Sequence, residues 1–141
     1  MNRTVILKSE QDTINLAKEF AEFVKHGAIL ALYGELGAGK TFFTQHLCKY
    51  LGVTENVSSP SYVLMNEYMG KFPIAHLDLY RLGATEEVLE LGLEEMFEDC
   101  LTIIEWPELA EPLLPEKTIR IKFKLIGEVR QVEISGIKNT E

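Results

Sequence analysis

The sequence predicts an α/β fold in which helices flank a mixed, mainly parallel central sheet and the chain ends in an antiparallel hairpin. Three observations support this prediction. An apolar strand at residues 28–33 passes through a glycine-rich turn into a helix at 42–51. Two later apolar segments of strand length each end on a carboxylate. Finally, apolar and polar residues alternate at 118–125 and 129–135, around the turn residues Gly127 and Glu128.

The segment before the glycine-rich turn predicts one strand and one helix. Residues 4–7 form a short apolar run that favours a strand. Ser9 is suited to cap a helix whose first turn carries Glu10 and Asp12. Apolar residues then repeat at helical spacing, and we expect Gly27 to end this helix.

The middle of the chain predicts an antiparallel strand pair. Residues 53–58 are polar and favour an irregular segment. The first strand is expected at 62–68 and the second at 72–77, with Gly70 and Lys71 in the turn between them. The second strand leads directly into Asp78.

The following part alternates short helices with one strand. Three segments favour helical turns: one capped by Thr85 and running to Leu89, one at 93–98, and one that begins at Pro107. A buried strand is expected at 101–104, directly before Glu105. Pro112 and Pro115 are expected to bracket a loop.

The composition favours one ordinary globular domain spanning residues 1–141. The chain has 141 residues, of which 46% are hydrophobic and 26% charged. It has no apolar run long enough to cross a membrane, and its first residues are too quickly polar for a secretory signal. Cys48 and Cys100 lack a C-x-x-C spacing, so we expect reduced thiols in the core and a cytoplasmic protein without membrane contact.

The charge balance argues against direct binding to nucleic acid. The formal net charge is −8 at pH 7, and Lys and Arg form no long run. An acidic chain does not attract the phosphate backbone. We therefore expect no DNA binding, and any RNA to be contacted mainly through a partner.

The glycine-rich turn carries the clearest chemical motif. It fits the phosphate-binding pattern G-x-x-x-x-G-K-[ST] at every fixed position: Gly34, Glu35, Leu36, Gly37, Ala38, Gly39, Lys40 and Thr41. Glycines permit the tight turn that aims successive N–H groups at phosphate oxygens, and the positive end of the next helix adds attraction. Lys40 is placed to reach phosphates and Thr41 to reach Mg²⁺. The motif predicts a nucleotide-binding P-loop.

Two carboxylates are candidates for the chemistry. Asp78 and Glu105 each follow an apolar strand, and ligands of open α/β sheets bind at the carboxyl ends of strands. One could serve Mg²⁺ and the other could orient the attacking water, but the sequence does not decide which. The competing structural roles are a turn cap for Asp78 and a surface acid or helix-dipole partner for Glu105.

Four further residues have a functional and a structural interpretation. Ser61 could sense the terminal phosphate from a mobile loop or bond to its local backbone. Arg81 could contact phosphate, although an ordinary ion pair is favoured. His76 is expected to be a core residue, not a ligand, and Trp106 to pack the site, a partner or the core.

Five blocks of this sequence together resemble the bacterial TsaE (YjeE) family. They cover almost the whole chain in the same order: Gly34 to Thr41, Ser59-Pro60-Ser61-Tyr62, His76-Leu77-Asp78-Leu79-Tyr80-Arg81-Leu82, Glu90-Leu91-Gly92-Leu93, and Ile104-Glu105-Trp106-Pro107-Glu108. The phosphate loop alone is common to many families. Its combination with the block from His76 to Leu82 and the block from Ile104 to Glu108 is highly specific.

The resemblance implies an ATPase of tRNA threonylcarbamoyladenosine biosynthesis. Members are cytoplasmic, bind ATP and Mg²⁺, hydrolyse ATP weakly alone, and act with the TsaB–TsaD pair that modifies tRNA. By position, it implies phosphate and Mg²⁺ roles for Lys40 and Thr41, a Mg²⁺-side role for Glu105, and an activity role for Asp78. It also implies a functional role for Trp106 and a nucleotide contact near the base for Glu10.

The chain departs from the family pattern at three positions. Ser61 stands where Thr is usual and keeps the hydroxyl. Tyr62 stands where Phe or Tyr is common, and Phe42 stands where many members have a second Thr, so that hydroxyl is absent.

Two other kinds of protein could use the same phosphate-binding loop: a small nucleotide or metabolite kinase, and a non-catalytic ATP-sensing assembly module. A kinase would need an Arg-rich lid, which these 14 Lys and Arg residues do not form.

Overall fold

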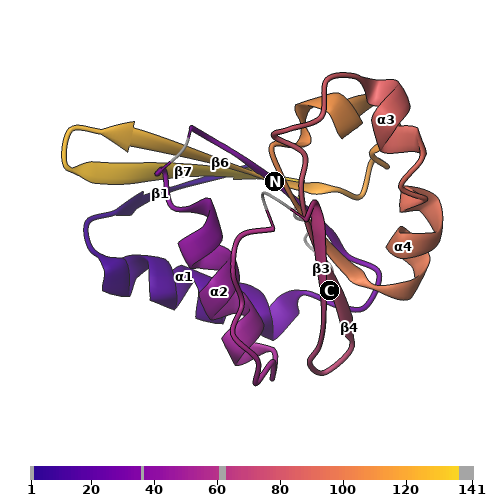
Figure 1. The fold of residues 1–141 in the computed structure, drawn as a ribbon. Coiled ribbons are helices and arrows are strands. Elements are labelled where there is room, and N and C mark those ends of the chain that lie inside the picture. The colour runs from indigo at the N-terminus through magenta and orange to yellow at the C-terminus, as the bar shows by residue number, and fades with distance from the viewer. Residues whose placement is uncertain (1, 36, 61–62, 137–141) are drawn as a thin grey trace.

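A computed structural model describes residues 2–35, 37–60 and 63–136. Within these residues the chain forms a seven-stranded sheet with the strand order β1-β7-β6-β2-β5-β4-β3, flanked by helices (Figure 1). The elements in chain order are β1 Arg3–Leu7, α1 Glu10–Phe23, β2 Ile29–Tyr33, α2 Lys40–Tyr50, β3 Met65–Met69, β4 Pro73–Asp78, α3 Thr85–Leu89, α4 Leu93–Asp99, β5 Leu101–Glu105, η1 Pro107–Leu113, β6 Ile119–Ile126 and β7 Val129–Ser135.

The sheet is mixed, with a parallel centre. β2 pairs in parallel with β5 and β6, and β5 pairs in parallel with β4. The outer pairs β3–β4, β6–β7 and β1–β7 are antiparallel. The predicted fold class, including its C-terminal β6–β7 hairpin, is confirmed. The parallel centre brings the carboxyl ends of β2, β4 and β5 to one edge of the sheet.

Two apolar clusters cover the two faces of this sheet. α1 and α2 pack on one face through a cluster that includes Phe20, Phe43 and Leu47. α3, α4 and η1 cover the other face around Leu77, Val88 and Ile104. Figure 1 shows the two groups of helices on opposite sides of the central strands. The central strands are therefore buried on both faces, as expected for near-continuous apolar runs.

The N-terminus of α1 has the predicted cap, but the predicted end of this helix is wrong. The Ser9 hydroxyl oxygen accepts a hydrogen bond from the Asp12 backbone N–H. The helix ends at Phe23, with Val24 as its C-cap, and Gly27 lies beyond it. Gly27 adopts φ +88° in the turn into β2, where its N–H donates to the Cys100 carbonyl. Its left-handed conformation serves that turn and not the helix end.

Three other predicted boundaries are corrected by the structure. Thr85 is the first residue of α3 and not its cap, because its hydroxyl donates to the Leu109 carbonyl. Pro112 lies inside the 3₁₀ helix η1, whose φ matches that of proline, and does not bracket a loop. β3 starts at Met65, later than predicted: Leu64, directly before it, has φ 76°, which interrupts an extended strand. The early part of that predicted strand includes Tyr62, which lies outside the described residues.

Both cysteines carry free thiols. Cys48 is buried on α2, and burial raises the pKa of its thiol to about 12. Cys100 is only half-buried, between α4 and β5. In the described part of the chain, every helix is too short or too polar to cross a membrane.

Candidate nucleotide-binding site

The glycine-rich loop connects β2 to α2 at the carboxyl edge of the sheet. It starts at Gly34, which has φ +142° and lies so close to β6 that an added Cβ would sit 2.7 Å from the Phe123 carbonyl oxygen. It ends at Gly39, the left-handed N-cap residue of α2. A side chain at Gly34 would collide with backbone, so this glycine lets the loop run beside β6.

The loop forms one wall of a cavity of about 290 Å³. α1, the ends of β4 and β5, and β7 contribute the other walls. The lining residues are Glu10, Thr13, Gly37, Gly39, Lys40, Thr41, Phe42, Ser59, Asp78, Glu105, Trp106 and Arg130. The structure therefore brings both strand-end carboxylates to the loop lysine and threonine, across long distances in the sequence.

Lys40 is buried at the start of α2, with 4% of its surface exposed. Its ammonium donates to the Gly34 carbonyl oxygen and lies 3.7 Å from the centre of the Trp106 ring. Burial lowers the pKa of Lys40, and the carboxylates of Glu105 and Asp78 act in the opposite direction. The charge is thus held at the cavity by a carbonyl dipole, an aromatic face and nearby acids.

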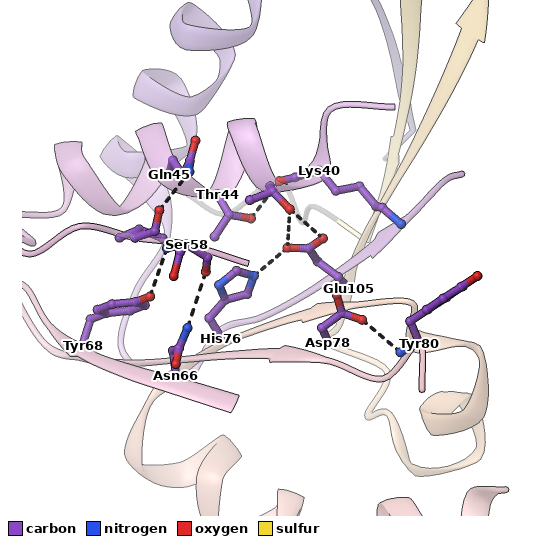
Figure 2. A network of polar contacts seen from close by, with 12 residues as sticks. Lys40, Thr44, Gln45, Ser58, Asn66, Tyr68, His76, Asp78, Tyr80 and Glu105 are labelled. Carbon is purple, nitrogen blue, oxygen red and sulfur yellow. Dashed lines mark hydrogen bonds and ion pairs between the residues drawn. The ribbon is translucent and has the colours of Figure 1, made fainter. Parts of the chain in front are cut away.

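Glu105 stands at the centre of a hydrogen-bond network (Figure 2). The Thr41 hydroxyl donates to its carboxylate, with oxygen separations of 3.1 Å to Oε1 and 3.3 Å to Oε2. His76 Nε2 lies 2.6 Å from the same Oε2. The carboxylate is 3% exposed, and these two partners tie it to α2 on one side and β4 on the other.

Asp78 lies beside Glu105 in the β4–β5 register. One of its oxygens, Oδ1, accepts a hydrogen bond from the Tyr80 backbone N–H at 2.9 Å. Asp78 therefore caps the turn after β4, as its structural interpretation predicted, and also lines the cavity. Glu105 is buried, which excludes a surface role for it.

The other predicted site residues divide into four groups. Glu10, Gly37 and Trp106 line the same cavity. Gly34, Glu35 and Ala38 line a second hollow of about 640 Å³, between the loop and the β6–β7 hairpin. Leu36 and Ser61 lie outside the residues that the structure describes. Arg81, a weaker candidate, is exposed on the turn after β4.

Four polar residues at the site were missed as functional candidates: Thr13 and Ser59, which line the cavity, and His76 and Arg130. His76 is fully buried, as expected of a core residue, but it bonds to Glu105. Its position two residues before Asp78, and hence on the same face of a strand, was an available signal. Arg130 lies on β7 and donates from Nη2 to the Gly37 carbonyl at 3.3 Å. No local sequence pattern predicts a role for Arg130, because only the strand order brings β7 to the loop.

The oxygen atoms around Thr41 fit a magnesium ion that is bound partly by the protein and partly by phosphate oxygens. Within the described residues, no group of three or more His, Cys, Asp or Glu side chains could hold a metal ion. The Thr41 hydroxyl and the Glu105 carboxylate nevertheless place hard oxygen atoms side by side. Mg²⁺ commonly takes one or two protein ligands and completes its shell with water and phosphate oxygens.

Comparisons with known proteins agree with this arrangement. A family model described as threonylcarbamoyl adenosine biosynthesis protein TsaE matches residues 7–132. A Rickettsia bellii protein named tRNA threonylcarbamoyladenosine biosynthesis protein TsaE is 42% identical over 134 residues, covering 94% of this chain and 93% of that protein. A Bacillus subtilis protein of the same name is 37% identical over 132 residues, covering 92% and 82%.

A solved structure supports the same relationship. The crystal structure of Bacillus subtilis YdiB superposes with a TM-score of 0.83 at 32% sequence identity, over 99% of this chain and 88% of that one. The family match and the two relatives each cover most of the chain. The chain belongs to the TsaE family of threonylcarbamoyladenosine biosynthesis proteins.

Proposed function

We propose that this chain is the ATP-binding and ATP-hydrolysing component of the machinery that makes threonylcarbamoyladenosine in tRNA. The family membership supports the pathway. One observation carries the ATPase assignment: Lys40, Thr41, Asp78 and Glu105 line a single cavity at the end of the phosphate loop. In this proposal residues 1–141 act as one cytoplasmic P-loop domain.

The loop and Lys40 bind the triphosphate. Gly37, Gly39 and the first turn of α2 supply N–H groups at the positive end of the helix dipole. The Lys40 ammonium exchanges its Gly34 carbonyl partner for phosphate oxygens, which are stronger acceptors because they are charged. Arg130 adds a second cation on the β7 side, and Glu10 contacts the nucleotide near its base.

Thr41 and Glu105 hold Mg²⁺, and Asp78 serves the water. Glu105 already contacts the Thr41 hydroxyl, whereas Asp78 Oδ1 accepts a hydrogen bond from the Tyr80 backbone N–H. Bound Mg²⁺ neutralises charge on the phosphate oxygens. The Asp78 carboxylate accepts a hydrogen bond from the attacking water, so that ATP and water give ADP and phosphate.

The partner is a TsaB–TsaD-type complex, and tRNA is reached only through that complex. Trp106 packs against Tyr80 with ring centres 4.8 Å apart, and Tyr80 is 53% exposed beside the cavity. Exposed aromatic side chains are enriched at protein interfaces. We assign this pair, together with Ser61, to coupling between the nucleotide and the partner.

Nucleotide titration tests the binding step. A hydrogen bond to a charged group contributes about 1.5–3 kcal/mol, so Lys40→Ala should weaken the binding of a fluorescent ATP analogue by at least about tenfold. Lys49→Ala is the matched control, because Lys49 is exposed on the same helix and does not line the cavity. Equal affinities for wild type and Lys40→Ala would contradict the assignment of nucleotide binding to this loop.

A further inference from the structure

His76 is a fully buried polar side chain that contacts the cavity only through another residue. It lies on β4 with no exposed surface, and its Nε2 is 2.6 Å from Glu105 Oε2 (Figure 2). It does not line the cavity itself. Because an ionised carboxylate only accepts hydrogen bonds, His76 Nε2 carries the hydrogen and donates it to Glu105.

We propose that His76 is a positioning residue that holds the Glu105 carboxylate in the orientation needed for Mg²⁺. This inference rests on the proposed ATPase function and adds a residue that acts through Glu105.

The sheet register explains why His76 can reach Glu105. Asp78 pairs with Glu105 across β4 and β5, and His76 pairs with Ile103 two residues earlier. His76 and Glu105 are therefore diagonal neighbours on one face of the sheet, a separation that long side chains bridge. Both partners come from central strands buried on both faces, so the contact is rigid.

Glu105 needs this support because its own torsions do not fix the carboxylate. The last torsion of a glutamate side chain is broad, and the group can rotate between its oxygens. His76 occupies Oε2, which leaves Oε1 with the shorter separation from the Thr41 hydroxyl, 3.1 Å against 3.3 Å for Oε2. A buried carboxylate also requires hydrogen-bond partners to offset its lost hydration. Partners of this kind typically change metal affinity by about 10- to 100-fold when they are removed.

Two substitutions separate a positioning role from packing alone. Gln can place an amide N–H near the position of Nε2, so His76→Gln keeps a donor to Glu105. Asn ends near the position of Nδ1, so His76→Asn remains polar but loses that donor. His26→Asn is the matched control, because His26 is exposed and precedes β2, at the strand end opposite to the loop.

The experiment measures the Mg²⁺ concentration at half-maximal effect on binding of the fluorescent ATP analogue, and the affinity in EDTA. His76→Asn should raise that Mg²⁺ concentration by about 10- to 100-fold and leave the EDTA affinity unchanged. His76→Gln should recover most of the wild-type Mg²⁺ response, and His26→Asn all of it. Equal losses in His76→Gln and His76→Asn, or no loss in His76→Asn, would overturn the proposal.

A second measurement does not depend on the folding of a histidine variant. In wild-type protein with labelled histidine, NMR should find the proton of the His76 ring on Nε2, and Glu105→Gln should shift that resonance. If the chemical shift of the His76 Nε2 resonance were the same in wild type and in Glu105→Gln, the contact would be refuted. Failure of the ATPase assignment is distinguishable, since Lys40→Ala would then bind the analogue as tightly as wild type.

Discussion

The two carboxylates of the site differ in their neighbours. Glu105 bonds to the Thr41 hydroxyl and to His76, so it is coupled to the first turn of α2. Asp78 Oδ1 bonds to the Tyr80 backbone at the start of the turn after β4. Their strand-end positions do not divide the two roles, although the family resemblance implies a Mg²⁺-side role for Glu105. These contacts support our proposal that Glu105 serves Mg²⁺ and Asp78 the water.

Paired amide substitutions test this division. Asp78→Asn should preserve Mg²⁺-dependent nucleotide binding but lower kcat by about 10²- to 10⁴-fold, the usual contribution of a general base. Glu105→Gln should instead weaken the Mg²⁺ dependence of binding. Binding titrations and steady-state phosphate release measure the two effects. The opposite pattern, with Mg²⁺ dependence lost in Asp78→Asn, would reverse our assignment.

At this scale the sequence predicts residues that belong to a contiguous motif or end a strand. Lys40 and Thr41 follow from the loop pattern, and Asp78 and Glu105 follow from apolar runs that end in acids. Arg130 was not predictable, because it reaches Gly37 only through pairing of strands distant in sequence. The contact between His76 and Glu105 was also not predictable, since it depends on the register of β4 against β5.

Among the elements, the junction of β2, the loop and α2 packs closely against β6. Phe43 on α2 contacts the rings of Phe20 and Phe123, with ring centres 5.4 Å and 5.8 Å away. Gly34 approaches the Phe123 carbonyl from the loop side. The position of the loop is therefore set by packing as well as by its own glycines.

Alanine substitutions at two loop glycines separate conformational strain from this close approach. Gly37→Ala meets no atom within 4 Å and has only its φ of +82° to overcome, at a cost of about 1–2 kcal/mol. Gly34→Ala also meets the Phe123 carbonyl, which should add about 1–3 kcal/mol. Urea unfolding measures both losses. A Gly34→Ala loss no larger than that of Gly37→Ala would contradict the packing argument.

Element types were easier to predict than element ends. Apolar periodicity identifies α1, but its end at Phe23 depends on the turn that Gly27 makes toward Cys100. The Thr85 hydroxyl looks like a cap in sequence, yet it is used by the distant Leu109 carbonyl. In both cases a contact from another element overrides the local preference.

For the whole molecule, the strand order determines what surrounds the candidate nucleotide site. The C-terminal hairpin was predicted, but its insertion between β1 and β2 was not, because turn residues specify hairpin pairing and not the neighbours of the pair. This insertion places β7 beside the loop and α1 at the cavity. The site thus includes residues from α1, from the centre of the chain and from β7.

Phosphate release from ATP, measured with and without a purified TsaB–TsaD pair, tests the central claim most directly. We predict weak release by the chain alone and strong stimulation by the pair, both abolished in Lys40→Ala because the lysine charge on the phosphates is lost. Measurable release without stimulation, or transfer of phosphate to a small metabolite, would contradict the account and favour a kinase.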